Sequence, residues 1–128
     1  MEKIENGHIP VLGSWRWRQT AVPWQGEWMP LKEFSRDEHI WTFRADGVMT
    51  SLCEGHPCYC TVYSYDPQQS LLVLDGYDLD PEGNRHAAVN ERYSCSFVGT
   101  DSMLLYDVED FMGVPGIRLR LQFSRMKI

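Results

Sequence analysis

The last stretch of the chain, GIRLRLQFSRMKI (residues 116–128), alternates strictly between apolar and polar side chains. Its apolar positions are Ile117, Leu119, Leu121 and Phe123. Alternation with a period of two places each kind of side chain on its own face of an extended strand, whereas an α-helix has a period of 3.6. The stretch therefore predicts a β-strand with one buried face and one exposed face.

Shorter stretches of the same alternation recur along most of the chain, and turn residues separate them. The first is GSWRWRQTAV, in which Trp15, Trp17 and Gln19 share one face. Three hairpins are predicted after it, over residues 39–53, 58–75 and 91–108. Their turns are expected at Asp46-Gly47, Asp66-Pro67 and Gly99-Thr100-Asp101, because these residues favour the backbone angles of tight turns.

Two segments lack this alternation and are predicted to be connections rather than strands. Residues 22–37 contain two prolines and a glycine, and a helical turn is expected around residues 31–34. Residues 76–90 are polar and acidic and are expected to form a loop.

This pattern predicts an all-β fold of eight strands, joined mostly by short turns between sequence neighbours. An eight-stranded antiparallel up-and-down barrel buries one face of every strand and leaves no exposed sheet edge. A two-sheet sandwich is the structural alternative. With 128 residues, the chain is expected to form one domain, and residues 1–10 are expected to be a loosely ordered N-terminal segment.

Charge and hydropathy exclude several classes of partner. The net charge is −6 and the basic residues are scattered, which argues against a nucleic-acid partner. No apolar run approaches the roughly 20 residues of a membrane-spanning helix. The N-terminal MEKIENGHIP has no apolar signal segment, so a cytoplasmic protein is expected as written, and an exported one if a signal has been removed.

Four short motifs in strand order carry a resemblance to a known family. They are Gly13-Ser14-Trp15, Phe43-Arg44-Ala45-Asp46-Gly47, Tyr63-Ser64-Tyr65-Asp66 and Phe123-Ser124-Arg125. With them, the chain resembles the lipocalin-like small β-barrel domains of bacteria, which belong to the calycin group. The resemblance implies that Trp15 packs under the barrel floor and that Arg125 lies across it, which a cation–π contact would favour.

An eight-stranded barrel is either filled by its own side chains or holds one small ligand. Both alternatives stay open, because many of the expected interior positions carry large rings. If a cavity exists, it is expected to bind a small apolar or amphipathic molecule. The residues expected to line it are Trp17, Trp41, Phe43, Tyr63, Phe97 and Leu119. Trp24 and Trp28 would then either cover the mouth or pack as a loop onto the barrel end.

Three of the four cysteines cluster in SLCEGHPCYC, with His56 between them. Cys53, His56, Cys58 and Cys60 have the side chains for a zinc site, but side chains two residues apart on a flat strand are too widely spaced for its usual geometry. Cys53 and Cys58 could form a disulfide across a hairpin in an exported protein. The favoured interpretation is that the cysteines are small buried hydrophobic residues, and that Cys95 belongs to the core.

Which face of the strand at residues 58–66 is buried also stays open. Tyrosines occupy one face, whereas two cysteines and a valine occupy the other. The competing sets are Tyr59, Tyr63 and Tyr65 against Cys58, Cys60 and Val62.

No metal, cofactor or catalytic residue is predicted. Residues 78–84 resemble the start of a calcium-binding loop, but position 89, where a bidentate glutamate is needed, is valine. His39, His56 and His86 lack partners at a recognised catalytic spacing, and Glu109-Asp110 is expected to be solvated.

Three hypotheses for the function follow from these patterns. The first is non-catalytic binding of a small molecule by a lipocalin-like barrel. The second is a protein–protein interaction or inhibitor-type domain that has a filled barrel and uses residues 22–37 and 76–90. The third is a metal-binding protein that uses the cysteine cluster.

Overall fold

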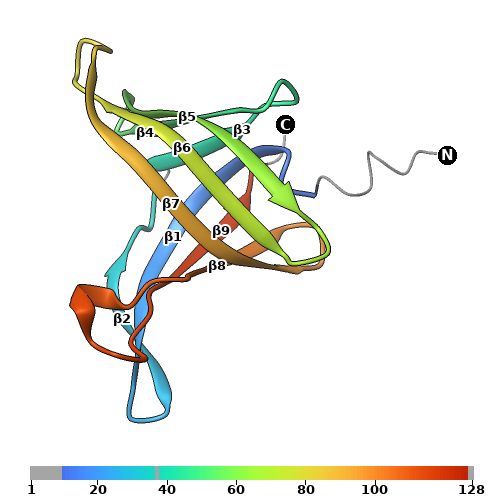
Figure 1. The fold of residues 1–128 in the computed structure, drawn as a ribbon, viewed down its shortest axis with the longest axis vertical. Coiled ribbons are helices and arrows are strands. Elements are labelled where there is room, and N and C mark those ends of the chain that lie inside the picture. The colour runs from blue at the N-terminus through green and yellow to red at the C-terminus, as the bar shows by residue number, and fades with distance from the viewer. Residues whose placement is uncertain (1–9, 37, 127–128) are drawn as a thin grey trace, which may run out of the picture.

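The computed structural model describes residues 10–36 and 38–126, which form a single antiparallel β-sheet of nine strands and one short 3₁₀ turn (Figure 1). The elements are β1 (Gly13–Trp24), β2 (Glu27–Glu33), β3 (His39–Phe43), β4 (Val48–Cys53), β5 (His56–Asp66), β6 (Leu71–Leu79), β7 (Arg85–Val98), β8 (Ser102–Asp107), η1 (Phe111–Gly113) and β9 (Arg120–Arg125). Of the expected N-terminal segment, residues 1–9 lie outside the described residues.

Eight of these strands close into a barrel, because β9 pairs with β1 as well as with β8. From β3 to β9, each strand pairs with its sequence neighbour, as in an up-and-down barrel. The predicted barrel is therefore confirmed. The sandwich alternative is wrong, since the β1–β9 ladder runs from Trp15–Arg125 to Ala21–Arg120 and leaves no gap between two sheets.

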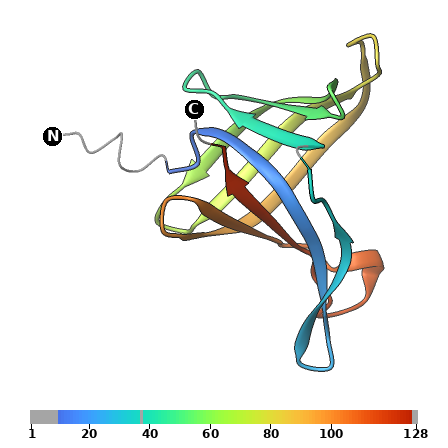
Figure 2. The ribbon, with the colours of Figure 1, turned by 180° about the vertical axis from the view of Figure 1, so that it is seen from behind.

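β1 is long enough to serve both the barrel and a projecting hairpin. It pairs with β3 through Arg16 and with β2 from Gln19 onward, so β3 and β2 lie one after the other along the same edge. A register shift between Trp17 and Gln19 accompanies this change of partner. The β1–β2 hairpin projects beyond the end of the barrel (Figures 1 and 2).

This hairpin corrects the prediction for residues 22–37. β1 continues to Trp24, and Gln25 and Gly26 form the turn with φ values of 53° and 81°. Two consecutive positive φ angles are typical of a tight hairpin turn. No helical turn forms at residues 31–34, because residues 31–33 belong to β2. Pro30 is tolerated there because β2 is an edge strand, where the missing N–H is not needed. Residue 37 lies outside the described part.

The expected loop at residues 76–90 is also wrong. β6 continues to Leu79 and β7 begins at Arg85, so a short turn joins two long strands. The Asp80 carboxylate accepts hydrogen bonds from the backbone N–H groups of Glu82 and Asn84 and so fixes this turn. Gly76 lies within β6, where a Cβ atom would stand 2.4 Å from the carbonyl oxygen of Cys60. The glycine marks a close approach of two strands rather than a loop.

The three predicted hairpin turns are confirmed. Gly47 has a φ of 86° between β3 and β4. The Asp66 carboxylate accepts hydrogen bonds from the backbone of Gln68 and Gln69 between β5 and β6. Residues 99–101 join β7 to β8.

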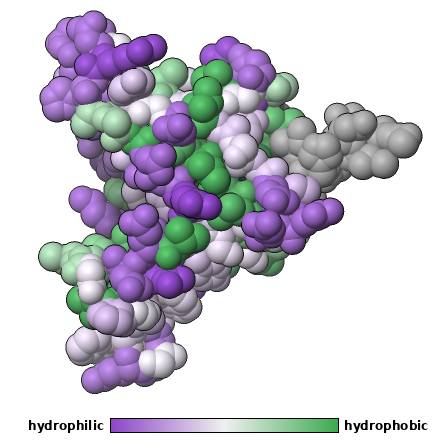
Figure 3. Space-filling view, viewed as in Figure 1, coloured by the Kyte–Doolittle hydropathy of each residue, from purple (hydrophilic) through white to green (hydrophobic). Residues whose placement is uncertain are grey.

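Alternation decides which side chains enter the barrel. In β5, Thr61 is buried whereas Val62 is 59% exposed, so the tyrosine face points inward and the cysteine face points outward. The buried core gathers inward residues from seven strands; its largest fully buried side chains include Trp15, Phe43, Met49, Leu72, Leu74, Met103, Leu105 and Phe123. On the outside, hydrophobic and hydrophilic residues are interspersed over the face shown in Figure 3.

Candidate functional site

One end of the barrel is closed by Trp15 and Arg125, the pair that the family resemblance predicts. The Arg125 guanidinium lies over the Trp15 ring, with its Cζ atom 4.2 Å from the ring centroid. It donates hydrogen bonds to the carbonyl oxygens of Pro10, Leu12 and Thr100. The Trp15 indole N–H donates to the Val11 carbonyl oxygen at 2.8 Å. Backbone from the N-terminal segment, the β7–β8 turn and β9 is thus joined at this end.

The other end contains a cavity of about 240 Å³. Inward-facing side chains from six strands, with Leu119 just before β9, line it. They are Trp17, Thr20, Trp41, Tyr59, Glu91, Tyr93, Asp107, Leu119 and Leu121. The interior therefore combines the two alternatives of the sequence: side chains fill the closed half, and a small space remains at the open end.

The structure divides the six predicted ligand-binding residues between the two ends. Trp17, Trp41 and Leu119 line the cavity. Phe43, Tyr63 and Phe97 do not; they pack with the closed-end core. The Phe43 ring meets Tyr63 edge-on at 5.0 Å, and Phe97 contacts both Trp15 and Tyr65.

Trp41 is the centre of the aromatic wall. Its ring centroid lies 5.9 Å from that of Trp17 and 6.5 Å from those of Tyr59 and Tyr93. Phe123, at 4.8 Å from Trp41, forms the packed layer beneath. Rings at such tilted and edge-on angles are favourable pairs that hold one another in place. The rings of the wall are thus held in position by their own packing.

Two carboxylates join this aromatic wall. Glu91 lies two residues before Tyr93 on β7 and accepts a hydrogen bond of 2.8 Å from its hydroxyl. Asp107, at the end of β8, is the register partner of Tyr93. One Asp107 oxygen accepts the backbone N–H of Glu109 at 3.0 Å.

Burial dominates the proton affinities in the cavity. It raises the pKa of Glu91; the Tyr93 hydrogen bond opposes this shift and the charge of Asp107 adds to it. Burial also raises the pKa of Tyr93 and of Tyr59, and the charge of Glu91 raises both further. The two tyrosine hydroxyls are therefore neutral donors at physiological pH.

Sequence reasoning missed Glu91 and Asp107, although a signal for both was present. Glu91, Tyr93, Cys95 and Phe97 alternate on one face of β7, and Asp107 continues the buried face of Met103 and Leu105 on β8. A carboxylate on the apolar face of a strand is unusual and indicates a site at the end of the barrel.

Trp24 and Trp28 do not cover the mouth of the cavity. Trp24 is 57% exposed near the tip of the β1–β2 hairpin. Trp28 packs against the outer face of the barrel, where it contacts the Tyr106 ring and stacks with the Arg120 guanidinium at 4.6 Å. The other expectation, a loop packed onto the barrel end, is also wrong, because Trp28 belongs to strand β2.

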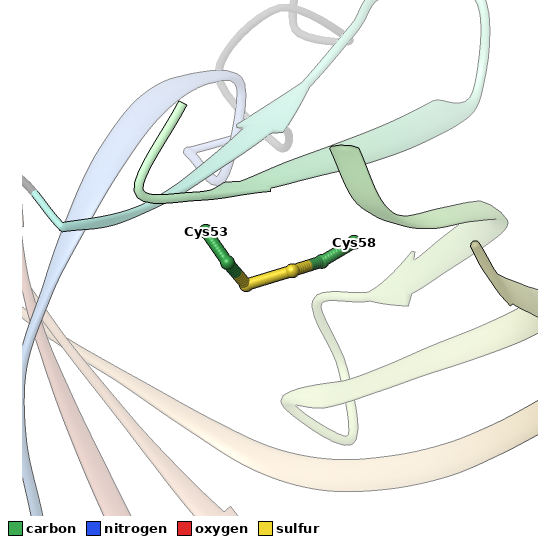
Figure 4. Close-up of a disulfide and its surroundings, with 2 residues drawn as sticks. All are labelled: Cys53 and Cys58. Atoms are coloured by element: carbon green, nitrogen blue, oxygen red, sulfur yellow. A yellow bond between two sulfur atoms is a disulfide. The ribbon is translucent and has the colours of Figure 1, made fainter. Parts of the chain in front are cut away.

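The cysteine cluster contains a disulfide between Cys53 at the end of β4 and Cys58 in β5 (Figure 4). The favoured interpretation of these three cysteines as small buried hydrophobic residues is therefore wrong. Two of them are bonded to each other, and Cys60 is exposed with a free thiol. A bulge places Leu52 opposite Pro57, which offsets Cys58 from the regular alternation. Cys95 is buried with the core as predicted, and burial raises the pKa of its thiol to about 12.

Across residues 10–36 and 38–126, no group of three or more His, Cys, Asp or Glu side chains is arranged to hold a metal ion. In the segment that resembles a calcium loop, oxygens of Asp78 and Asp80 accept backbone N–H groups of the β6–β7 hairpin. His39 packs against both Phe34 and Trp17, and the Nδ1 atom of His86 lies 3.9 Å from an Asp78 oxygen. Asp110 pairs with Arg118.

Within the described residues, no helix is long and apolar enough to cross a membrane. The sequence matches no family model, no curated protein and no solved structure.

Proposed function

We propose that this protein is a non-catalytic binding protein that takes one small molecule with an apolar body into the open end of its barrel. The observation that carries the proposal is the 240 Å³ cavity, walled by Trp17, Trp41, Tyr59 and Tyr93 at one end of a barrel that is closed at the other. Ligand pockets are mostly concave and aromatic, with a few placed polar groups. The volume is slightly below the usual range of about 300–1,000 Å³, which favours a ligand of single-ring size.

The packing around the cavity supports this proposal. The rings are held by one another and by the layer beneath them, so a ligand would enter a site that needs little rearrangement. The lipocalin-like resemblance of the sequence agrees with a ligand at the open end of the barrel.

The test is native against denaturing mass spectrometry of the protein purified without chelator. We expect an excess native mass that corresponds to a small organic molecule. Leu119→Trp, which adds bulk to the cavity wall, should abolish it. Val62→Trp adds similar bulk on the outer face of β5 and should keep it. An unchanged excess mass in Leu119→Trp, or no excess mass and no saturable tryptophan fluorescence change with single-ring aromatic probes, would refute the proposal.

A second candidate function rests on the β1–β2 hairpin. Its apolar side chains are unusually exposed, including Trp24 at 57% and Leu31 at 47%. Exposed apolar side chains gathered on a projecting element are typical of protein–protein contact surfaces. Trp24→Ser should weaken such a contact without changing the fold, whereas ligand binding in the barrel should be unaffected.

A further inference from the structure

The charge of the cavity wall restricts the chemistry of its ligand. Two of the lining residues, Glu91 and Asp107, carry carboxylates, and no lysine, arginine or histidine is among the described residues that line the cavity. Removing ionised carboxylates from water without a cationic partner is unfavourable. A purely apolar ligand would desolvate them further, whereas a cation would compensate them.

The aromatic wall favours the same kind of ligand. Four rings from four different strands, those of Trp17, Trp41, Tyr59 and Tyr93, surround the space. Faces of aromatic rings attract cations, tryptophan most strongly, and cages of such rings are a recurrent way to bind ammonium groups. The rings and the carboxylates would therefore both attract a cationic group in this cavity.

A buried hydroxyl next to this wall gives an independent observation. Ser51 on β4 is the register partner of both Trp41 and Tyr59, and only 2% of its surface is exposed. Its hydroxyl oxygen has no hydrogen-bond partner among the described residues. Buried hydroxyls are normally satisfied, and each exception requires an explanation. Ser51 is not itself a lining residue, so a water between the two rings would have to connect its hydroxyl to a bound donor.

We propose that the ligand is a small organic cation: an ammonium group on an apolar body about the size of one ring. The ammonium group lies near Glu91 and Asp107, and the apolar body packs between Trp41 and Leu119. This inference rests on the proposed function, because it assumes that the cavity takes a small molecule. The net charge of −6 gives the protein a field that attracts cations over anions.

Three probes with one skeleton separate charge from shape: 2-phenylethylammonium, its neutral isostere propylbenzene, and the anion 3-phenylpropanoate. Each is titrated at neutral pH while tryptophan fluorescence is followed. We expect the cation to bind roughly 10- to 100-fold more tightly than propylbenzene, from cation–π attraction and charge-assisted hydrogen bonds. The anion should bind more weakly than propylbenzene.

Two neutralising variants connect this preference to the site. Glu91→Gln and Asp107→Asn should each lower the affinity for the cation about tenfold and should not lower that for propylbenzene, because the neutral ligand then no longer desolvates a carboxylate. The charge-matched control is Asp75→Asn, on the exposed outer face of β6, which should have no effect. Near-ultraviolet circular dichroism of each variant checks that its aromatic core is intact, and the two independent sites protect the test against one misfolded variant.

The outcomes distinguish this inference from the proposed function. If propylbenzene binds as tightly as the cation, and Leu119→Trp removes both, the cavity binds a small molecule but the inference of a cation is wrong. If Asp75→Asn weakens cation binding as much as Glu91→Gln, the preference comes from overall charge, and the inference also fails. If none of the probes binds, both the inference and the proposed function are overturned.

Discussion

Replacing Arg125 tests whether the closed end holds the barrel together. Its guanidinium donates three hydrogen bonds, at 2.6–2.7 Å, to carbonyl oxygens from two separate segments and also covers the Trp15 ring. Arg125→Ala removes all four interactions at once. The backbone N–H of residue 125, which donates to the Asp101 carbonyl oxygen, is unaffected.

The magnitude follows from these contacts. A buried hydrogen bond to a charged group contributes about 1.5–3 kcal/mol, and the two bonds to Pro10 and Leu12 are partly buried. We reduce each to about 1–1.5 kcal/mol, and the exposed bond to Thr100 to about 0.5 kcal/mol. With about 1 kcal/mol for the cation–π contact, Arg125→Ala should lower the free energy of unfolding by about 3–5 kcal/mol.

Arg125→Lys tests whether the positive charge at this position is sufficient without the planar shape of the guanidinium. Lysine keeps the positive charge, but its compact ammonium group cannot reproduce the planar guanidinium that spans three carbonyls and stacks on a ring. We expect it to lose about half as much stability as Arg125→Ala. The control is Arg118→Ala, which removes the same charge from an exposed pair with Asp110 and should change stability by no more than about 0.5 kcal/mol.

Urea unfolding followed by tryptophan fluorescence measures these differences, and thermal unfolding should show a decrease in Tm of about 10–20 °C for Arg125→Ala. The reasoning is refuted if Arg125→Lys is as stable as the unchanged protein, because charge alone would then suffice. It is also refuted if Arg125→Ala and Arg118→Ala have equal effects.

Three further predictions follow from other parts of the fold. In the native protein a thiol reagent should label Cys60 rapidly, and Cys95 should react only after unfolding, because it is buried with a pKa of about 12; rapid labelling of both would contradict its placement. Gly76→Ala should destabilise the protein by about 2–3 kcal/mol in urea unfolding, because its Cβ would meet β5 backbone, whereas Gly83→Ala, with open space, should lose about 1 kcal/mol through its φ of 88°. For Glu91 the folded-state pKa is raised, so its contribution to stability is full below the unfolded pKa and is lost as the pH rises through the folded pKa. The unchanged protein should therefore gain stability relative to Glu91→Gln as the pH falls from 7 toward 4.5, and a parallel pH dependence of the two would contradict this.

The sequence was sufficient to predict the barrel because alternation and turn chemistry are local. Asp46-Gly47 specifies its turn locally, and the alternation of the last stretch correctly predicts the strand Arg120–Arg125 (β9). The prediction is wrong for residues 116–119, which alternate in the same way but precede the strand, and residues 127–128 lie outside the described part. The predictions were wrong where tertiary contacts determine the conformation of a segment. Pro30 lies in a strand because that strand is at an edge, and Gly76 lies in a strand because the neighbouring strand approaches closely.

The candidate site could be predicted only in part for a related reason. Trp17, Trp41 and Leu119 were identified from their apolar alternation, which is the signal that the core also produces. Phe43 carries the same signal but belongs to the other end, because the depth of a residue along the barrel depends on strand stagger, which a single sequence does not specify. Glu91 was not predicted as a site residue, because a charged side chain is normally exposed to solvent.

The hydrogen bonds that close the barrel also affect how the sequence can evolve. All three acceptors of the Arg125 guanidinium are backbone carbonyl oxygens, which every amino acid provides. The side chains at positions 10, 12 and 100 can therefore drift without loss of these bonds. Among the described residues that make these contacts, the restricted ones are Trp15, Arg125 and Gly13, where a Cβ atom would stand 2.9 Å from the guanidinium. Closure of the barrel thus fixes few side chains, so residues at the open end can change without loss of the contacts that close the other end.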